Sequence, residues 1–219
     1  MKSLSLIEKY IKNYTIKEPF YLKKIKKKMK KITKHYNMSI GSYQGRILSL
    51  ISKIKQPKYI LEIGTFIGYS TLCLYEGLKK NGLLITIEIN ENFNKISKKI
   101  FKKLKFNNKI KSILGDAKKI ITKLPYKFDL VFIDADKKNY YNYFNLVINK
   151  VNKKGIIISD NTFFFGKIFN KKKIIEMKKK KCYNNLYKMH IYNNKLIKDK
   201  RVENFVLPIR DGLSISLKK

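Results

Sequence analysis

Five apolar runs of strand length follow one another between residues 59 and 160, and each is separated from the next by a polar segment long enough for a helix. The runs are YILEI, LLITIE, IKSILGD, FDLVFID and GIIISD. Strands that alternate with helices form right-handed β-α-β crossovers, because a twisted strand packs back onto its sheet only in that hand. The pattern predicts an α/β fold with a doubly wound, mostly parallel sheet.

Two further runs, VENFVLPI and LSISLKK, are joined by the turn Arg210-Asp211-Gly212. Because this turn is too short for a crossover helix, we expect an antiparallel hairpin at the edge of a seven-stranded sheet.

The 219 residues fit a single domain, 1–219. Residues 1–56 form its predicted helical N-terminal part, and 57–219 its core. Pro57 closes the last N-terminal helix, in which one face carries Ile47, Leu48, Ile51 and Ile54.

The first strand-length run continues into a glycine loop, in the stretch YILEIGTFIGYSTL from Tyr59 to Leu72. Strand, glycine loop and helix are the beginning of a nucleotide-binding α/β fold. A dinucleotide site requires G-x-G-x-x-G, whose middle glycine lets the backbone approach a pyrophosphate. This loop has only Gly64 and Gly68, so it does not match the dinucleotide pattern.

An acidic residue lies at or beside the carboxyl end of each of the five runs: Glu62, Glu88, Asp116, Asp134 and Asp160. Ligands of open α/β sheets bind at that edge. The alternative is that these acids are solvated or cap the following helices. Carboxylates repel a pyrophosphate, so the pattern favours a cofactor with positive charge and free ribose hydroxyls. S-adenosylmethionine has a sulfonium, an ammonium and a ribose, and it has no phosphate.

The formal net charge of +36 suggests a polyanionic partner. However, only Arg46, Arg201 and Arg210 are arginine, and the remaining 48 basic residues are lysine. Nucleic-acid readers favour arginine, because its planar fork binds guanine and phosphate bidentately. The shortage of alanine and tryptophan indicates mutational drift toward A and T, so we interpret the lysine runs 23–31 and 178–181 as solvated faces rather than RNA contacts.

Cys73 and Cys182 are far apart in the chain and have no C-x-x-C spacing, which indicates neither a disulfide framework nor a zinc site. No apolar run is long enough for a signal-peptide core or a membrane span. We therefore expect a cytoplasmic protein without a membrane partner.

Six motifs together resemble the cation-dependent O-methyltransferases, the family of caffeoyl-CoA and catechol O-methyltransferases and their bacterial relatives. They are EIGTFIGYS, TIEIN, GDA, FDLVFIDADKKNY, SDN and LPIRDGL, in the order of the family. The resemblance runs from about Met38 to the C-terminus. It implies the Rossmann-like class I methyltransferase fold, S-adenosylmethionine as cofactor, N-terminal helices over the cofactor site, and a homodimer.

The resemblance also implies roles for individual residues. Glu62 and Gly64 hold the methionine end of the cofactor with Ser70 nearby, and Glu88 accepts hydrogen bonds from the ribose hydroxyls. Asp116 and Ala117 flank the adenine, and Asp136 is a second carboxylate near the cofactor. Met38 and the segment 39–46 close over it.

Asp134, Asp160 and Asn161 match the family's three ligands of a divalent metal, and Lys137 matches its general base. Two carboxylates and an amide carbonyl are hard oxygen ligands, which suit Mg²⁺ or Mn²⁺. A phenol has a pKa near 10, so its attack on the sulfonium methyl at pH 7 requires help from a metal and a base.

The expected acceptor is a small molecule with a catechol-like hydroxyl. The aromatic residues Phe163 to Phe165, Tyr183, Tyr187 and Tyr192 either form a substrate loop or belong to the core. Two other functions remain open. One is methylation of a hydroxyuridine in tRNA, and the other is a basic RNA-binding module with vestigial methyltransferase activity.

Overall fold

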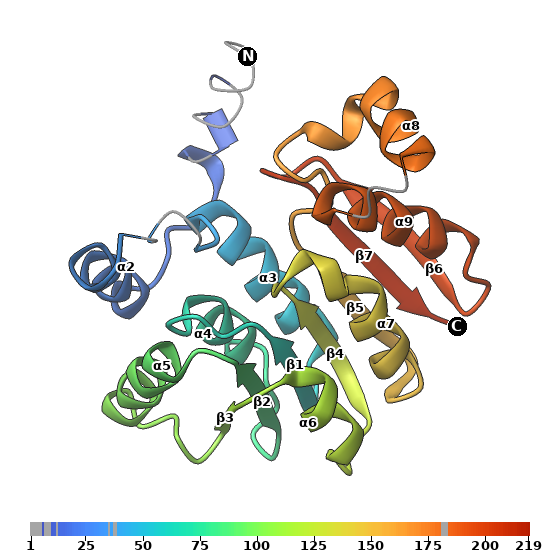
Figure 1. The fold of residues 1–219 in the computed structure, drawn as a ribbon. Helices are drawn as coiled ribbons and strands as arrows, with labels where there is room; N and C mark the ends of the chain where they lie inside the picture. The colour runs from blue at the N-terminus through green and yellow to red at the C-terminus, as the bar shows by residue number, and fades with distance from the viewer. Residues whose placement is uncertain (1–5, 7–9, 12, 35, 37–38, 181–183) are drawn as a thin grey trace.

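The seven strands form one sheet in the order β3-β2-β1-β4-β5-β7-β6 (Figure 1). This computed structural model describes all residues except 1–5, 7–9, 12, 35, 37–38 and 181–183. The strands are β1 (Tyr59–Ile63), β2 (Leu83–Glu88), β3 (Ile110–Leu114), β4 (Phe128–Ile133), β5 (Val151–Ser159), β6 (Val202–Leu207) and β7 (Leu213–Lys218). Strands β1 to β5 pair in parallel, and β7 runs antiparallel to β5 and β6. The predicted α/β class and the edge hairpin are confirmed.

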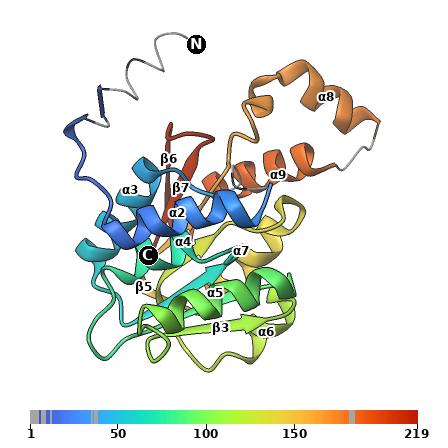
Figure 2. The ribbon, with the colours of Figure 1, turned by 90° about the vertical axis from the view of Figure 1, so that its left-hand side faces the viewer.

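Helices cover both faces of the sheet (Figures 1 and 2). One face carries α2 (Phe20–Ile32), α3 (Ser42–Lys55), α4 (Tyr69–Tyr75) and α5 (Glu91–Lys103). The other carries α6 (Ala117–Lys123), α7 (Tyr140–Ile148) and α9 (Asn185–Lys198). The short helix α8 (Lys171–Lys179) packs on α9, and 3-10 turns form η2 (Lys137–Asn139) and η3 (Lys167–Phe169).

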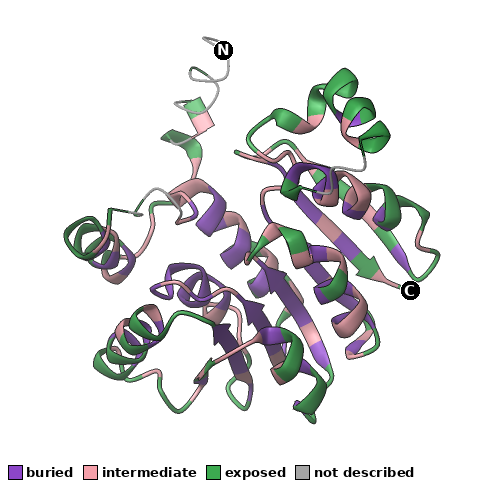
Figure 3. Cartoon of the chain, viewed as in Figure 1, coloured by how far each residue is buried: buried purple, intermediate pink, exposed green. Residues whose placement is uncertain are grey.

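Successive side chains of a strand point to opposite faces of the sheet, and in the central strands both sets are apolar, so helices cover both faces. In β4, Leu130 and Phe132 belong to the apolar cluster under α3 and α4, whereas Val131 and Ile133 belong to the cluster under α7 and α9. All four are fully buried, and the central strands are buried along most of their length in Figure 3. A strand buried on both sides has an almost continuously apolar sequence, which is the pattern that revealed these strands.

Helix α3 packs with a different face from the one that its apolar residues suggest. Leu48 is buried, but Ile54 is 76% exposed, while Ser49 and Ser52 are buried. Ser52 Oγ donates a hydrogen bond to the carbonyl of Leu74. A side chain at Gly77 would lie 2.1 Å from the Ser52 backbone, so small residues let α3 and α4 approach closely. The face of α3 that carries small residues therefore packs against α4, and Ile54 stays exposed.

Within the part of the chain that the structure describes, no helix has the length and apolar character needed to cross a membrane.

Candidate functional site

A cavity of about 870 Å³ opens at the carboxyl ends of the parallel strands. The segments 39–40 and 210–211 contribute to its wall, although they are far from the strand ends in sequence. Most predicted site residues line it: Gly64, Ser70, Glu88, Asp116, Ala117, Asp134, Asp136, Lys137, Asp160 and Asn161. Met38 lies outside the described residues. Glu62 is described but does not line the cavity.

Gly64 turns the chain out of β1 in a left-handed conformation, with φ of +98°. A Cβ atom at this position would lie 2.0 Å from the carbonyl oxygen of Asp134. No side chain fits at that distance, so contact between the loop and the end of β4 already requires glycine here. Gly64 lines the cavity and also fixes the spacing of two strand ends.

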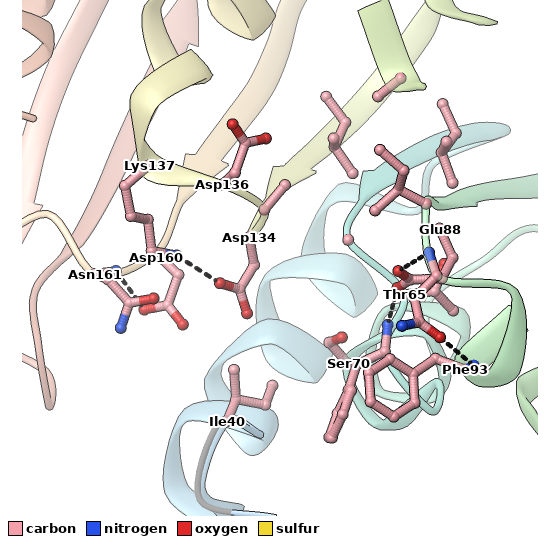
Figure 4. A pocket seen from close by; sticks show the side chains of 18 of the residues that line it. Ile40, Thr65, Ser70, Glu88, Phe93, Asp134, Asp136, Lys137, Asp160 and Asn161 are labelled. Atoms are coloured by element: carbon pink, nitrogen blue, oxygen red, sulfur yellow. Dashed lines mark hydrogen bonds and ion pairs between the residues drawn. The ribbon is translucent and has the colours of Figure 1, made fainter. Parts of the chain in front are cut away.

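Glu88 organises the loop on the β2 side of the cavity. Its Oε2 accepts a hydrogen bond from the Phe66 N–H at 2.7 Å, and its Oε1 accepts one from the Asn90 N–H at 2.8 Å. Figure 4 shows the carboxylate near Thr65 and Phe93. Each carboxylate oxygen has about two acceptor positions, so both keep capacity for ligand hydroxyls. At the end of β3, Asp116 caps α6 by accepting from the Lys118 N–H at 2.9 Å.

Glu62 lies beneath the cavity and is fully buried. Its Oε2 accepts hydrogen bonds from the hydroxyls of Thr71 and Thr86, whereas its Oε1 has no hydrogen-bond partner among the described residues. Burial raises the pKa of Glu62 to about 7, against the opposing effect of hydrogen bonds from Ser70, Thr71 and Thr86. The structure therefore makes Glu62 a support of the loop and of α4 rather than a wall of the cavity.

Asp134 and Asp160 come from the neighbouring strand ends of β4 and β5, and they lie on the opposite side of the cavity from Glu88 (Figure 4). Asp160 is only 3% exposed, and its Oδ1 accepts a hydrogen bond from the Asn161 N–H at 2.7 Å. Burial and the negative charge of Asp134 raise the pKa of Asp160. The fully buried amide of Gln44 lies near Asp160, and neither its Nε2 nor its Oε1 has a hydrogen-bond partner among the described residues.

This donor set fits a hard divalent cation. Two carboxylates and an amide oxygen are the kind of ligands that Mg²⁺ and Mn²⁺ prefer, and Asp134, Asp160 and Asn161 all line the cavity. Among the described residues no three His, Cys, Asp or Glu side chains gather at one point. A metal site at this position would therefore need amide ligands in addition to the carboxylates.

Lys137 opens the turn η2 and is held on the same side of the cavity. Its Nζ donates to Asp134 Oδ1 at 3.0 Å and to the Tyr140 hydroxyl at 2.7 Å. Tyr140 is fully buried and its hydroxyl donates to the Ile133 carbonyl at 3.3 Å. The next acid, Asp136, accepts from the Tyr143 hydroxyl and from Asn139 Nδ2. Buried tyrosines of α7 thus orient both charged groups.

The structure separates the predicted aromatic cluster. Tyr192 is fully buried, and its hydroxyl lies 2.6 Å from Ser159 Oγ, so it belongs to the core. Tyr187 packs between α8 and α9. Phe165 lines the cavity and is 73% exposed, whereas Tyr183 lies outside the described residues. Of the described members of this cluster, only Phe165 lines the cavity.

Sequence reasoning did not single out Gln44, Tyr140 or Phe93. Tyr140 ends the motif FIDADKKNY, and Gln44 lies inside the N-terminal segment that was expected to close over the cofactor. Phe93 falls on the first turn of α5 and contacts Phe66 edge to face, with 4.6 Å between ring centroids. Gln44 and Tyr140 lie in recognisable segments of the sequence and Phe93 does not, and the contacts of all three depend on the fold.

Known proteins resemble this chain in both sequence and structure. A catechol O-methyltransferase of Niastella koreensis is 33% identical over 137 residues, which cover 61% of this chain and 62% of that protein, less than two thirds of its length. A caffeoyl-CoA O-methyltransferase of Stellaria longipes is 29% identical over 198 residues, covering 86% of this chain and 80% of that protein.

Two solved structures share the fold. A methyltransferase of Podospora anserina bound to SAH superposes with a TM-score of 0.87 at 24% identity, over 100% of this chain and 96% of that one. An O-methyltransferase of Bacillus cereus in complex with SAH has a TM-score of 0.83 at 22% identity, over 98% and 97%. The O-methyltransferase family matches residues 12–219. The chain therefore belongs to that family, the S-adenosylmethionine-dependent O-methyltransferases of the caffeoyl-CoA and catechol type.

Proposed function

We propose that this chain methylates a hydroxyl of a catechol-like small molecule in a reaction that depends on a divalent metal. The observation that supports this most is the convergence of Asp134 and Asp160 in the cavity that Glu88 also lines. One side of the cavity then holds the cofactor, and the other holds the acceptor.

On the cofactor side, Glu88 accepts hydrogen bonds from the ribose hydroxyls, and Ala117 lies against the adenine with Asp116 beside it. The carboxylates of the cavity favour a sulfonium cofactor, because they attract its positive charge and repel phosphates. Gly64 and Ser70 lie at the methionine end, and Asp136 is the second carboxylate near the cofactor.

On the acceptor side, Asp134, Asp160 and Asn161 hold Mg²⁺ or Mn²⁺. The bound metal supplies Lewis-acid chemistry, which lowers the pKa of an acceptor hydroxyl and orients it. Lys137 is the proposed proton acceptor, and its hydrogen bonds to Asp134 and Tyr140 hold Nζ at this side of the cavity. Alignment of the acceptor oxygen with the methyl group then supplies much of the rate enhancement.

The formal charge of +36 favours a second candidate, methylation of tRNA at a hydroxyuridine. A basic RNA-binding module with little turnover is the third candidate. Transfer of labelled methyl groups to catechols and to bulk tRNA, with and without EDTA, tests all three. We expect labelled catechol and no product after EDTA. Labelled tRNA alone would support the second candidate, and RNA binding without any labelled product would support the third.

A further inference from the structure

Arg210 differs from the other two arginines of the chain in having no carboxylate partner among the residues that the structure describes. Arg46 binds Glu76 through both of its terminal nitrogens, at 3.0 and 2.6 Å. Arg201 binds Asp199 through Nε and Nη2, at 2.9 and 2.6 Å. Arg210 donates only to the Ser39 carbonyl, at 3.2 Å from Nη1, among the described residues. Most of its donors are therefore available to a ligand.

The position of Arg210 directs those donors to the acceptor side. It lies in the loop between β6 and β7 and lines the cavity. The same loop is tied to the segment that follows Asn161, because the Thr162 N–H donates to the Gly212 carbonyl at 3.1 Å. The Phe165 N–H donates to Asp211 Oδ1 at 2.6 Å. The loop that carries Arg210 is thus hydrogen-bonded to the segment that directly follows Asn161, a proposed metal ligand.

The charge of the cavity makes this arginine unusual. Its other charged side chains are carboxylates, apart from Lys137, which is the one lysine among the described residues that lines it. Lys137 is already paired with Asp134. An acceptor with a negative group would be repelled by the carboxylates unless a cation faced that group. Arg210 supplies such a cation, next to the exposed ring of Phe165.

We infer that Arg210 selects acceptors in which the aromatic diol carries a carboxylate, which the guanidinium fork binds. Arginine suits this task because its planar fork matches the two oxygens of a carboxylate. The inference rests on the proposed function, since it assigns a substrate class to the same site. The competing explanation is purely structural: Cδ, Nε and Cζ of Arg210 lie 3.6 to 3.8 Å from the Cβ position of Gly41, and the side chain only fastens the segment before α3.

The test compares catechol with 3,4-dihydroxybenzoate as acceptors for the wild-type protein and for Arg210→Gln. We expect the wild type to prefer the carboxylate. The variant should lose about 10- to 100-fold in kcat/KM on 3,4-dihydroxybenzoate, mainly through KM, as expected for one charge-assisted contact. The kcat/KM of Arg210→Gln on catechol should change by less than about threefold. On 3,4-dihydroxybenzoate, Arg210→Lys should have a kcat/KM between those of the wild type and Arg210→Gln. Arg201→Gln is the matched control, because Arg201 does not line the cavity.

Other results would overturn the inference. Equal losses on both acceptors would assign Arg210 the structural role. A tenfold loss of S-adenosylmethionine affinity in calorimetry would mean that Arg210 binds the carboxylate of the cofactor instead. Equal wild-type activity on both acceptors would refute the inference and leave the proposed function intact. Labelling of tRNA without labelling of either acceptor would refute both.

Discussion

The two sides of the cavity differ in how their acids are satisfied. On the cofactor side, Glu88 and Asp116 each accept hydrogen bonds from backbone N–H groups, which belong to nearby residues or to the loop after β1. On the acceptor side, Asp134 and Asp160 come from neighbouring strand ends, and the buried amide of Gln44 near Asp160 has no hydrogen-bond partner among the described residues. On the first side, backbone groups of the chain already hold each acid in place. The second has polar groups that remain for an ion or a substrate.

This difference follows from the origin of the residues. The cofactor side is built by consecutive β-loop-α units, in which each donor comes from the unit of the acid or from the preceding unit. The acceptor side combines β4 and β5 with the segments 39–44, 163–165 and 210–212, which meet only in the folded chain. We therefore expect substitutions on the acceptor side to affect catalysis and those on the cofactor side to affect binding and stability.

The largest effect is expected for Asp160→Ala. Loss of a proposed metal ligand should reduce methyl transfer by about 10⁴-fold or more, because the metal orients and activates the acceptor. Affinity for S-adenosylmethionine, measured by calorimetry, should stay within about threefold. Retained activity in this variant and in EDTA would place the chain among metal-independent methyltransferases and remove the contrast between the two sides.

Lys137→Ala should lower kcat by about 10²- to 10⁴-fold if Lys137 accepts the proton. Calorimetric binding of Mg²⁺ should persist, because both carboxylates remain. Lys138→Ala is the matched control, since Lys138 is the adjacent residue and is exposed. Similar rates in the two variants would show that Lys137 has no catalytic role.

The buried Glu62, which lies beneath the cavity, should make the free energy of unfolding depend on pH. Its pKa is raised from 4.5 to about 7 by burial, so the folded protein holds an extra proton between these values. The resulting stabilisation is complete below pH 4.5 and is lost as the pH rises through about 7. Glu62→Gln stays neutral, so between pH 5 and pH 8 its free energy of unfolding should fall by about 2–3 kcal/mol less than that of the wild type. Urea unfolding of the cofactor-free protein measures this, and parallel curves would contradict it.

The smallest effect is expected for Glu88→Gln. An amide keeps the shape but loses the charge and one acceptor, so S-adenosylmethionine affinity should fall by about 1–2 kcal/mol. Glu91→Gln is the control, because Glu91 is exposed and pairs with Lys95 at the surface. Equal affinities in the two variants would argue against a ribose contact. Competition by ATP or NADH would instead indicate a phosphate-bearing cofactor.

The sequence was most informative where the relevant contacts are local. Apolar runs identified every strand, and the acid that follows a strand could be located without knowing the fold. It was least informative where packing decides. Glu62 and Glu88 both lie at the ends of strands, yet only Glu88 lines the cavity. Glu62 pairs with Thr86, two residues before Glu88, and the hydroxyls of Thr71 and Thr86 hold its carboxylate beneath α4. The need for glycine at position 64 likewise depends on a carbonyl of another strand.

The sequence by itself determined the α/β class, the family and the edge of the sheet that carries the acids, because these depend on period, motif order and strand ends. Only the tertiary structure decided which residues share the acceptor side. Gln44, Asp160 and Arg210 come from three distant segments, and no local pattern encodes their approach. Their arrangement follows from the packing of α3 against α4 and from the hairpin that adds β7 to β5, since long-range contacts of this kind are set by the whole core.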